Sequence, residues 1–257
     1  MWKKELKVAK EAASAAGKIL IRLFGRVIHV TKKGTIDLVT EADFQSEKTV
    51  IDIIRRYFPR DSVLSEEFGE HDRSSGRTWI IDPLDGTTNF VHGFPFFAVS
   101  IALEINGELV AGVVLNPFMT ELFEAAKKTG AFLNSNPIAV SGTSNLEDSL
   151  LATGFPYDIQ ERADEVLNRF RKMVVVSQGI RRPGSAALDM CYVAAGRLDG
   201  FWEQGLKPWD TAAGKIIIEE AGGTLSTFRG EHYTPYQNSV VAANPFIHEA
   251  MLDAMNS

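Results

Sequence analysis

The chain contains very little cysteine and no long apolar run. Its single cysteine among 257 residues, Cys191, excludes an intramolecular disulfide. Cys191 lies in the apolar stretch 186–195, which is typical of a buried helix, so we expect a core thiol rather than a nucleophile. No segment offers the roughly 18 consecutive apolar residues of a membrane span, and the first residues lack the apolar core of a signal peptide. We therefore expect a cytoplasmic protein without a membrane partner.

An excess of basic residues is also missing. Lys and Arg number 27 against 33 Asp and Glu, which gives a net charge of −6. Nucleic-acid-binding domains are usually basic, so no nucleic-acid partner is expected. The acidic balance fits a carboxylate-rich site that needs cations, and it fits a solubilising surface equally well. The length is that of one large domain or two closely associated halves.

Three familiar motifs are absent from the most distinctive segment, which reads DPLDGTT over residues 82–88. A calcium-binding EF-hand loop needs oxygen ligands at its third and fifth positions, where this segment has Leu84 and Gly86. A phosphatase of the haloacid dehalogenase type would carry two aspartates separated by one residue, whereas two residues separate them here. A P-loop is likewise missing. These familiar phosphate and calcium motifs are excluded.

The segment nevertheless combines metal ligands with an anion site. An apolar strand ends in Asp82, and Pro83 then forces a tight turn that allows Asp82 and Asp85 to converge. The carbonyl of Leu84 can point to the same place, and such hard oxygens are the ligands that Mg²⁺ prefers. Residues 86–88 begin a short helical turn, whose free N–H groups favour a phosphate. The alternative is an ordinary surface turn capped by an aspartate.

Other acidic residues occur where they could join this site. Glu66 follows the short strand 62–65 and would lie beside Asp82 if the two strands are neighbours; otherwise it belongs to a solvated Glu pair. Asp210 stands in the first turn of a predicted helix, where a capping role alone would explain it. Asp43 could cap a second helix. Each residue taken alone is a weak signal.

Hydrophobic periodicity predicts helices first, then antiparallel strands, then alternating strands and helices. Apolar residues at steps of three and four predict a helix over 6–23, and another covers about 43–57. The pair Asn106-Gly107 joins alternating strands at 97–105 and 109–115, which predicts a β-hairpin. Further strands are expected at 62–65, 78–82, 120–126, near 132 and 138, and at 150–153, 198–203 and 239–243, with helices at 160–173, from 184, at 208–220 and from 245.

This order predicts an α+β fold, a layered α-β-α-β-α sandwich. Its antiparallel-rich first half would cover residues 1–143 and carry the metal and phosphate loop. Its α/β second half would cover residues 144–257 and carry substrate contacts and one metal ligand.

Several segments together resemble the inositol monophosphatase family, a member of the magnesium-dependent, lithium-sensitive phosphatases. In the family's order, the matching segments are 37–43 (DLVTEAD), 65–67 (SEE), 82–90 (DPLDGTTNF), 208–210 (PWD) and 219–223 (EEAGG). The resemblance extends from about residue 32 to residue 244. Segments 181–189 (RRPGSAALD) and 196–200 (GRLDG) bring it closest to the bacterial members.

The resemblance implies roles for the matching residues. Two to three Mg²⁺ ions would be held by Glu66, Asp82, the Leu84 carbonyl, Asp85 and Asp210. Asp43 and Thr87, with Glu66, would form the catalytic set that orients the attacking water. Substrate contacts would come from Asp85, Gly86, Thr87, Thr88, Gly184, Ser185, Ala186, Glu203 and Asp210. The family commonly has Thr where this chain has Ser185, so the hydroxyl is kept. The resemblance also implies a homodimer.

The expected activity is hydrolysis of a small phosphate monoester by metal-activated water, with myo-inositol 1-phosphate as the first candidate. Fructose 1,6-bisphosphate, histidinol phosphate and a phosphoadenosine nucleotide remain alternatives. Glu203 favours a polyol, because a carboxylate accepts hydrogen bonds from hydroxyls, whereas Arg181 and Arg182 would favour a second phosphate. A regulatory or scaffold protein without turnover is the alternative from another class. Such a protein should have lost a ligand, and every matching acidic position here is filled.

Overall fold

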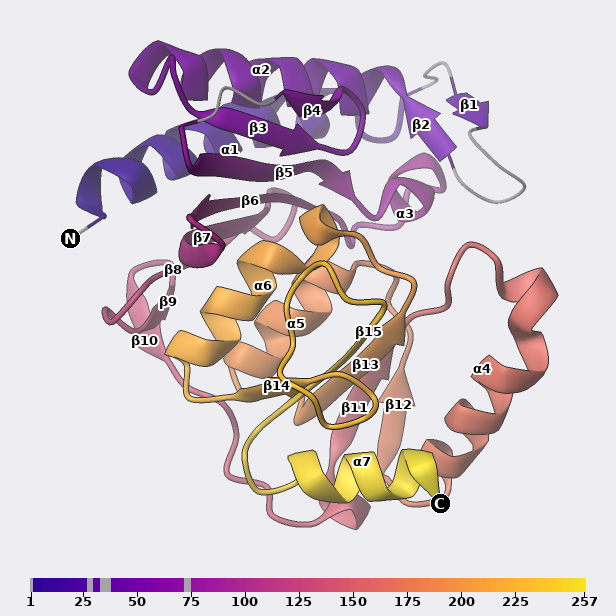
Figure 1. Ribbon diagram of the computed structural model, residues 1–257. Coiled ribbons are helices and arrows are strands. Elements are labelled where there is room, and N and C mark those ends of the chain that lie inside the picture. The colour runs from indigo at the N-terminus through magenta and orange to yellow at the C-terminus, as the bar shows by residue number, and fades with distance from the viewer. Residues whose placement is uncertain (1, 27–29, 33–37, 72–74) are drawn as a thin grey trace.

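The computed structural model of the chain describes residues 2–26, 30–32, 38–71 and 75–257. Five layers follow one another in space (Figure 1). Helices α1 (Lys3–Leu23) and α2 (Glu41–Tyr57) cover one face of an eight-stranded sheet. Helices α5 (Ala186–Ala194) and α6 (Pro208–Glu220) lie between that sheet and a five-stranded sheet. Helix α7 (His248–Asn256) packs on the far side of the second sheet, which confirms the predicted α-β-α-β-α sandwich.

The eight-stranded sheet is formed by strands before residue 139 in the order β10-β9-β8-β7-β6-β5-β3-β4. Its strands are β3 (Ser62–Ser65), β4 (Gly69–His71), β5 (Arg77–Asp85), β6 (Ala98–Ile105), β7 (Glu108–Asn116), β8 (Glu121–Ala126), β9 (Ala131–Leu133) and β10 (Asn136–Ile138). All neighbours are antiparallel except β3 and β5. The predicted hairpin is confirmed: Asn106 and Gly107 form its two-residue turn, both with positive φ, as the twist of the strands requires.

The five-stranded sheet is mixed, in the order β12-β11-β13-β15-β14. Its strands are β11 (Leu150–Thr153), β12 (Gly179–Arg181), β13 (Gly200–Gln204), β14 (Thr224–Ser226) and β15 (Ser239–Ala243). Strand β11 is parallel to β12 and β13, whereas β15 is antiparallel to both of its neighbours. A separate pair, β1 (Val30–Lys32) and β2 (Leu38–Thr40), precedes α2.

Two of the apolar cores involve the eight-stranded sheet, and a third packs α7 against the second sheet around Trp202. One joins the buried stripe of α1 and α2 to the outer face of the large sheet, around Trp79 and Ile81. The other lies between the two sheets, where Ile80 and Ala102 of the first half pack with α5 and α6 of the second. Both halves therefore share a core. The predicted boundary at residue 143 falls between the strands of the two sheets. That the two halves are separate units stays a prediction.

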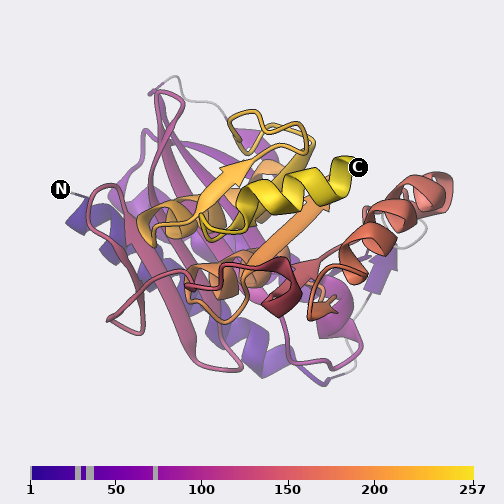
Figure 2. The same cartoon turned by 90° about the horizontal axis from the view of Figure 1, so that it is seen from below.

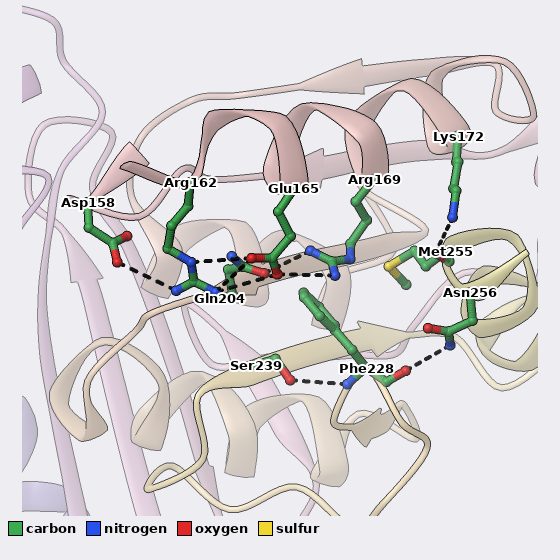
Figure 3. A network of polar contacts seen from close by, with 10 residues as sticks. All are labelled: Asp158, Arg162, Glu165, Arg169, Lys172, Gln204, Phe228, Ser239, Met255 and Asn256. Atoms are coloured by element: carbon green, nitrogen blue, oxygen red, sulfur yellow. Dashed lines mark hydrogen bonds and ion pairs between the residues drawn. The ribbon is translucent and has the colours of Figure 1, made fainter. Parts of the chain in front are cut away.

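Helix α4 (Ile159–Val174) stands at one side of the molecule beside α7 (Figure 2). It buries only Val166 and Met173, so polar contacts provide much of its attachment. Arg169 donates to Gln204 Oε1 on β13 at 2.8 Å, and Lys172 Nζ donates to the Met255 carbonyl on α7 at 3.1 Å (Figure 3). These contacts tie α4 to α7 and to the end of β13, which lines the site described below.

Some predicted boundaries were wrong. Strand β13 begins at Gly200, not at residue 198, because the Asp199 carboxylate accepts from Leu150 N and holds a turn there. Helix α7 begins at His248, not at residue 245, because Asn244 Oδ1 accepts from two following backbone N–H groups in a preceding turn. Strands β1, β2, β4, β12 and β14, of three residues each, were missed, since three residues are too few for a period-two pattern.

Candidate active site

The parallel pair of strands β3 and β5 brings the first acids together. Ser65, the last residue of β3, lies opposite Ile81 of β5, so Glu66 follows beside Asp82. The predicted neighbourhood of these two strands is confirmed. The predicted strand end at Asp82 was wrong: β5 continues to Asp85 with a register shift after Asp82, whose carboxylate accepts from Leu84 N at 3.0 Å and stabilises this bulge before the turn at Gly86. Gly86 closes this turn with a φ of 93°, and a Cβ there would lie 3.0 Å from the Phe96 carbonyl. Only glycine fits this position without strain.

Helix α2 supports the turn from behind through its first residues. Asp43 was predicted as a possible cap; the N-cap is in fact Thr40, and Asp43 is its capping-box partner at N3. Asp43 Oδ2 accepts from Thr40 N at 2.8 Å and from Thr40 Oγ1 at 2.6 Å. The other oxygen, Oδ1, lies 3.1 Å from the Thr87 hydroxyl, which is also 2.9 Å from the Leu84 carbonyl. Thr87 thus links Asp43 to the loop.

Two further α2 residues, which we did not predict from the sequence, hold the loops in place. Ser46 donates to the Pro83 carbonyl at 2.7 Å. Glu47, fully buried, accepts from Glu67 N at 3.0 Å and from Phe68 N at 2.8 Å, which fixes the turn that carries Glu66. A sequence signal existed: both residues continue the buried stripe of the helix toward its start, where polar side chains need specific partners.

The second half of the chain closes the site. Asp85 Oδ2 accepts from the Ser185 hydroxyl at 2.5 Å and from Ala187 N at 2.8 Å, so it caps helix α5. The Ser185 hydroxyl is therefore used within the protein. Asp210 occupies N3 of α6, and its carboxylate accepts from Lys207 N at 2.6 Å. The capping role considered for Asp210 is confirmed, and it coexists with a place in the site.

One cavity of about 420 Å³ gathers nearly all of the predicted site residues. Its walls include Glu66, Asp82, Leu84, Asp85, Gly86, Thr87, Thr88, Gly184, Ser185, Ala186, Glu203 and Asp210. Asp43 is the exception: it is completely buried and reaches the cavity only through Thr87. Asp37, the first residue of a matching segment, lies outside the described residues.

The wall opposite the acidic loop contains residues that the sequence did not single out. Asp189, one turn into α5, and Gly154, after β11, both line the cavity. The Glu203 carboxyl lies against Gly154, where a Cβ would overlap it. Of the two arginines considered for a second phosphate, Arg182 lines the cavity and stacks on the Phe155 ring at 5.5 Å, whereas Arg181 is not part of the wall. Cys191 is fully buried, as predicted.

The acids strongly affect one another. Burial, followed by the charges of neighbouring acids, raises the pKa of Asp82 well above its usual value; those acids are Glu66, Asp85 and Asp210. Burial likewise raises the pKa of Asp85 to about 6, against the hydrogen bond from Ser185. It raises the pKa of Asp210 to about 7. Burial and then the Asp210 charge raise the pKa of Glu203, which lines the same cavity, to about 8.

The donor chemistry suits a hard cation, although the acids are not in ligating positions. Among the described residues, no three His, Cys, Asp or Glu side chains form a ready metal-binding group. The cavity nevertheless supplies carboxylate oxygens from Glu66, Asp82, Asp85 and Asp210 and the carbonyl of Leu84, which is the oxygen donor set that Mg²⁺ prefers. Burial, and then repulsion from neighbouring acids, raises the pKa of Asp82, and a cation would relieve that repulsion. The residues therefore fit such an ion.

The fold and this cavity define a protein of the inositol monophosphatase class. The model of the inositol monophosphatase family matches residues 1–257, and the chain belongs to that family. Family membership supports a phosphatase.

The relatives carry two kinds of name. The chain is 45% identical over 252 residues to the inositol-1-monophosphatase of Synechocystis, covering 97% of this chain and 88% of that protein. It is also 45% identical over 254 residues to the Nus factor SuhB of Pseudomonas aeruginosa, covering 96% of this chain and 94% of that protein.

Solved structures agree with the fold. The extragenic suppressor protein suhB of Bartonella henselae superposes with a TM-score of 0.96 at 41% identity, covering 99% of each chain. The inositol monophosphatase of Anabaena gives a TM-score of 0.90 at 43% identity, covering 99% of this chain and 96% of that one. In the part of the chain that the structure describes, no helix is both long and apolar enough to cross a membrane.

Proposed function

We propose that the chain is a Mg²⁺-dependent phosphatase that hydrolyses small phosphate monoesters, with myo-inositol 1-phosphate as the best substrate. One observation carries the proposal. Four acids from three distant segments line a single cavity at high mutual cost, although acids in a merely structural role would be spread apart. Glu66, Asp82, the Leu84 carbonyl, Asp85 and Asp210 would hold two to three ions.

When bound, Mg²⁺ would neutralise these acids, lower the pKa of a water molecule and stabilise the charge that develops on the leaving oxygen. The side chains supply the rest of the mechanism. The Thr87 hydroxyl lies between Asp43 and the Leu84 carbonyl, so it is placed to orient a water molecule for attack. Asp43 would act as the base that accepts a proton from this water through the Thr87 hydroxyl. Glu66, which lines the same cavity, would be the third member of the catalytic set.

The phosphate and the alcohol would occupy opposite sides of the cavity. The N–H groups of residues 86–88 have no intrahelical acceptor and would receive the phosphate. Glu203, which lines the same cavity, would accept a hydrogen bond from a hydroxyl of the alcohol. The segment 184–186 would complete the substrate site through its backbone, because the Ser185 hydroxyl is bound to Asp85.

A panel of phosphate esters assayed with Mg²⁺ tests the proposal. Chelation with excess EDTA should abolish hydrolysis and added Mg²⁺ should restore it; full activity in chelator would contradict the metal mechanism. Lithium inhibition is expected from the family. Among the esters, myo-inositol 1-phosphate should give the highest kcat/KM.

A bisphosphate is the second candidate, because Arg182 and Lys207 both line the cavity and could bind a second phosphate. The same assay decides between the two. A kcat/KM for fructose 1,6-bisphosphate above that for myo-inositol 1-phosphate would favour the bisphosphate and contradict the polyol role of Glu203. The intact set of acids argues against a purely regulatory member, despite the Nus factor name of some relatives.

Assembly, location and partners belong to the same proposal. We expect a cytoplasmic homodimer, which light scattering would test, and no nucleic-acid partner, since the net charge is −6. Binding of RNA at physiological salt by the purified protein would contradict that last expectation.

A further inference from the structure

Asp189 is a buried acid that the mechanism above does not use. Its side chain is 1% exposed and belongs to the cavity wall. Its Oδ1 atom has no hydrogen-bond partner, one of only four such buried side-chain atoms in the described residues. A buried acceptor without a partner is unfavourable, so proteins rarely keep one without a reason.

The other buried acids of this region show what a structural role looks like. Asp85 caps α5, Asp199 accepts from Leu150 N, and Glu47 accepts from two backbone N–H groups. Asp189 makes its backbone bond to the Ser185 carbonyl as any helical residue does, but Oδ1 caps nothing. Its neighbours along α5, Leu188 and Met190, are apolar and fully buried. The packing of the helix thus gives no reason for an acid at this position.

Gln204, which also lines the cavity and has an unpartnered amide nitrogen, differs from Asp189 in one respect. Its Oε1 accepts from Arg169 of α4, so its side chain is held on the α4 side of β13 (Figure 3). The preceding residue, Glu203, lines the cavity with its carboxyl against Gly154. Asp189 and Glu203 both line the cavity, and neither is among the residues proposed to hold metal ions.

Building on the proposed function, we infer that Asp189 is a specificity-determining residue that accepts a hydrogen bond from a hydroxyl of the substrate's alcohol group. Rotation about its Cβ–Cγ bond exchanges the two oxygens, so either can meet a group in the cavity. A hydroxyl is the matching chemistry, because it donates a hydrogen bond without adding negative charge beside Glu203. A polyol has hydroxyls enough to bond Asp189 and Glu203 together.

Two variants and two substrates test this inference. Asp189→Leu removes both oxygens, and Asp189→Asn keeps one acceptor. Met190→Leu, a volume-conserving change on the same helix, serves as the control. Each protein is assayed with Mg²⁺ on myo-inositol 1-phosphate and on 4-nitrophenyl phosphate, whose leaving group carries no alcohol hydroxyl. The ratio of the two kcat/KM values does not depend on the folded fraction of the preparation.

Asp189→Leu should lower kcat/KM for myo-inositol 1-phosphate roughly tenfold to a hundredfold, the loss expected for a hydrogen bond to a carboxylate. Asp189→Asn should lose less, and Met190→Leu should leave the ratio unchanged. Activity on 4-nitrophenyl phosphate should stay within about threefold in all variants. A parallel loss on both substrates would show that Asp189 serves only the structure, and no loss on either would show that it meets only water; both results overturn the inference. Failure of the wild-type protein to hydrolyse either ester would instead overturn the proposed function.

Discussion

Asp85→Asn removes one charge from the acidic cavity while keeping the shape of the side chain. The Asn Oδ1 atom can replace the carboxylate oxygen that accepts from Ser185 and from Ala187 N, so the cap on α5 survives. The pKa of Asp85 is raised from 3.8 to about 6, chiefly by burial. Two units correspond to about 3 kcal/mol of folding free energy that the wild-type, metal-free protein loses when Asp85 ionises.

The sign of this effect fixes its pH dependence. Because the pKa is higher in the folded state, the stabilisation is fully present below the unfolded value near 4 and disappears as the pH rises through about 6. Asn carries no such dependence. For a chain of 257 residues, about 3 kcal/mol shifts the melting temperature by roughly 6 °C. In the absence of metal, Asp85→Asn should therefore melt roughly 6 °C higher than wild type at pH 8 and close to it at pH 4.

The assay combines melting curves in EDTA with turnover in Mg²⁺. If Asp85 is a metal ligand, turnover on myo-inositol 1-phosphate should fall by two or more orders of magnitude, on the order of the loss of an electrostatic contact to the transition state. Asp199→Asn is the matched control: it changes a buried aspartate outside the cavity, should melt lower than wild type because Asp199 holds Leu150 N and Ser141, and should keep its kcat. A variant Asp85→Asn that melts lower at pH 8 yet turns over normally would refute the assignment.

Three further outcomes are expected. Gly154→Ala should place a methyl group against the Glu203 carboxyl. The kcat/KM for myo-inositol 1-phosphate should therefore fall, and the free energy of unfolding should drop by about 1–3 kcal/mol. An unchanged melting curve would show that the cavity wall accommodates the methyl group without cost. Thr87→Val should lower kcat at least about a hundredfold while costing only about 1 kcal/mol of stability from its bond to Asp43, and a normal kcat would remove Thr87 from the mechanism. Wild-type protein in EDTA should melt at progressively lower temperature from pH 5 to pH 8, because the pKa values of Asp210 and Glu203 are raised to about 7 and about 8. A melting temperature that rises with pH under these conditions would contradict the conclusion that ionisation of these buried acids destabilises the metal-free fold.

Local chemistry was enough to single out residues 82–88 in the sequence, although the end of β5 was placed at Asp82 and not at Asp85. Residues 82–88 combine a strand end, a Pro, a Gly and two acids, and their turn needs no distant partner to be recognised. The position of Glu66 beside Asp82 depended on one condition, the adjacency of two strands, which the parallel pairing of β3 and β5 fulfils. Long periodic helices such as α1 and α2 were recovered for the same local reason.

The remaining parts of the site depend on tertiary contacts that carry no local signal. Ser46 and Glu47 matter because a loop about 20 to 40 residues away offers them backbone partners. Asp189 differs from an ordinary helical acid only through its burial in the cavity wall. The first residue of β13 was misplaced because the Asp199 carboxylate, a side chain, decides where the strand begins.

The cap that Asp85 places on α5 joins residues 100 and 102 positions apart in the chain. Contacts over such separations form only after the entropy of closing a long loop has been overcome. During synthesis, the loop at 82–88 leaves the ribosome about a hundred residues before the helix that completes its cavity. A chain made only through the first sheet therefore has Glu66, Asp82 and Asp85 but neither Asp210 nor the enclosure. Hydrolytic activity should consequently require that both sheets have docked, and an incomplete chain should be inactive in the cell.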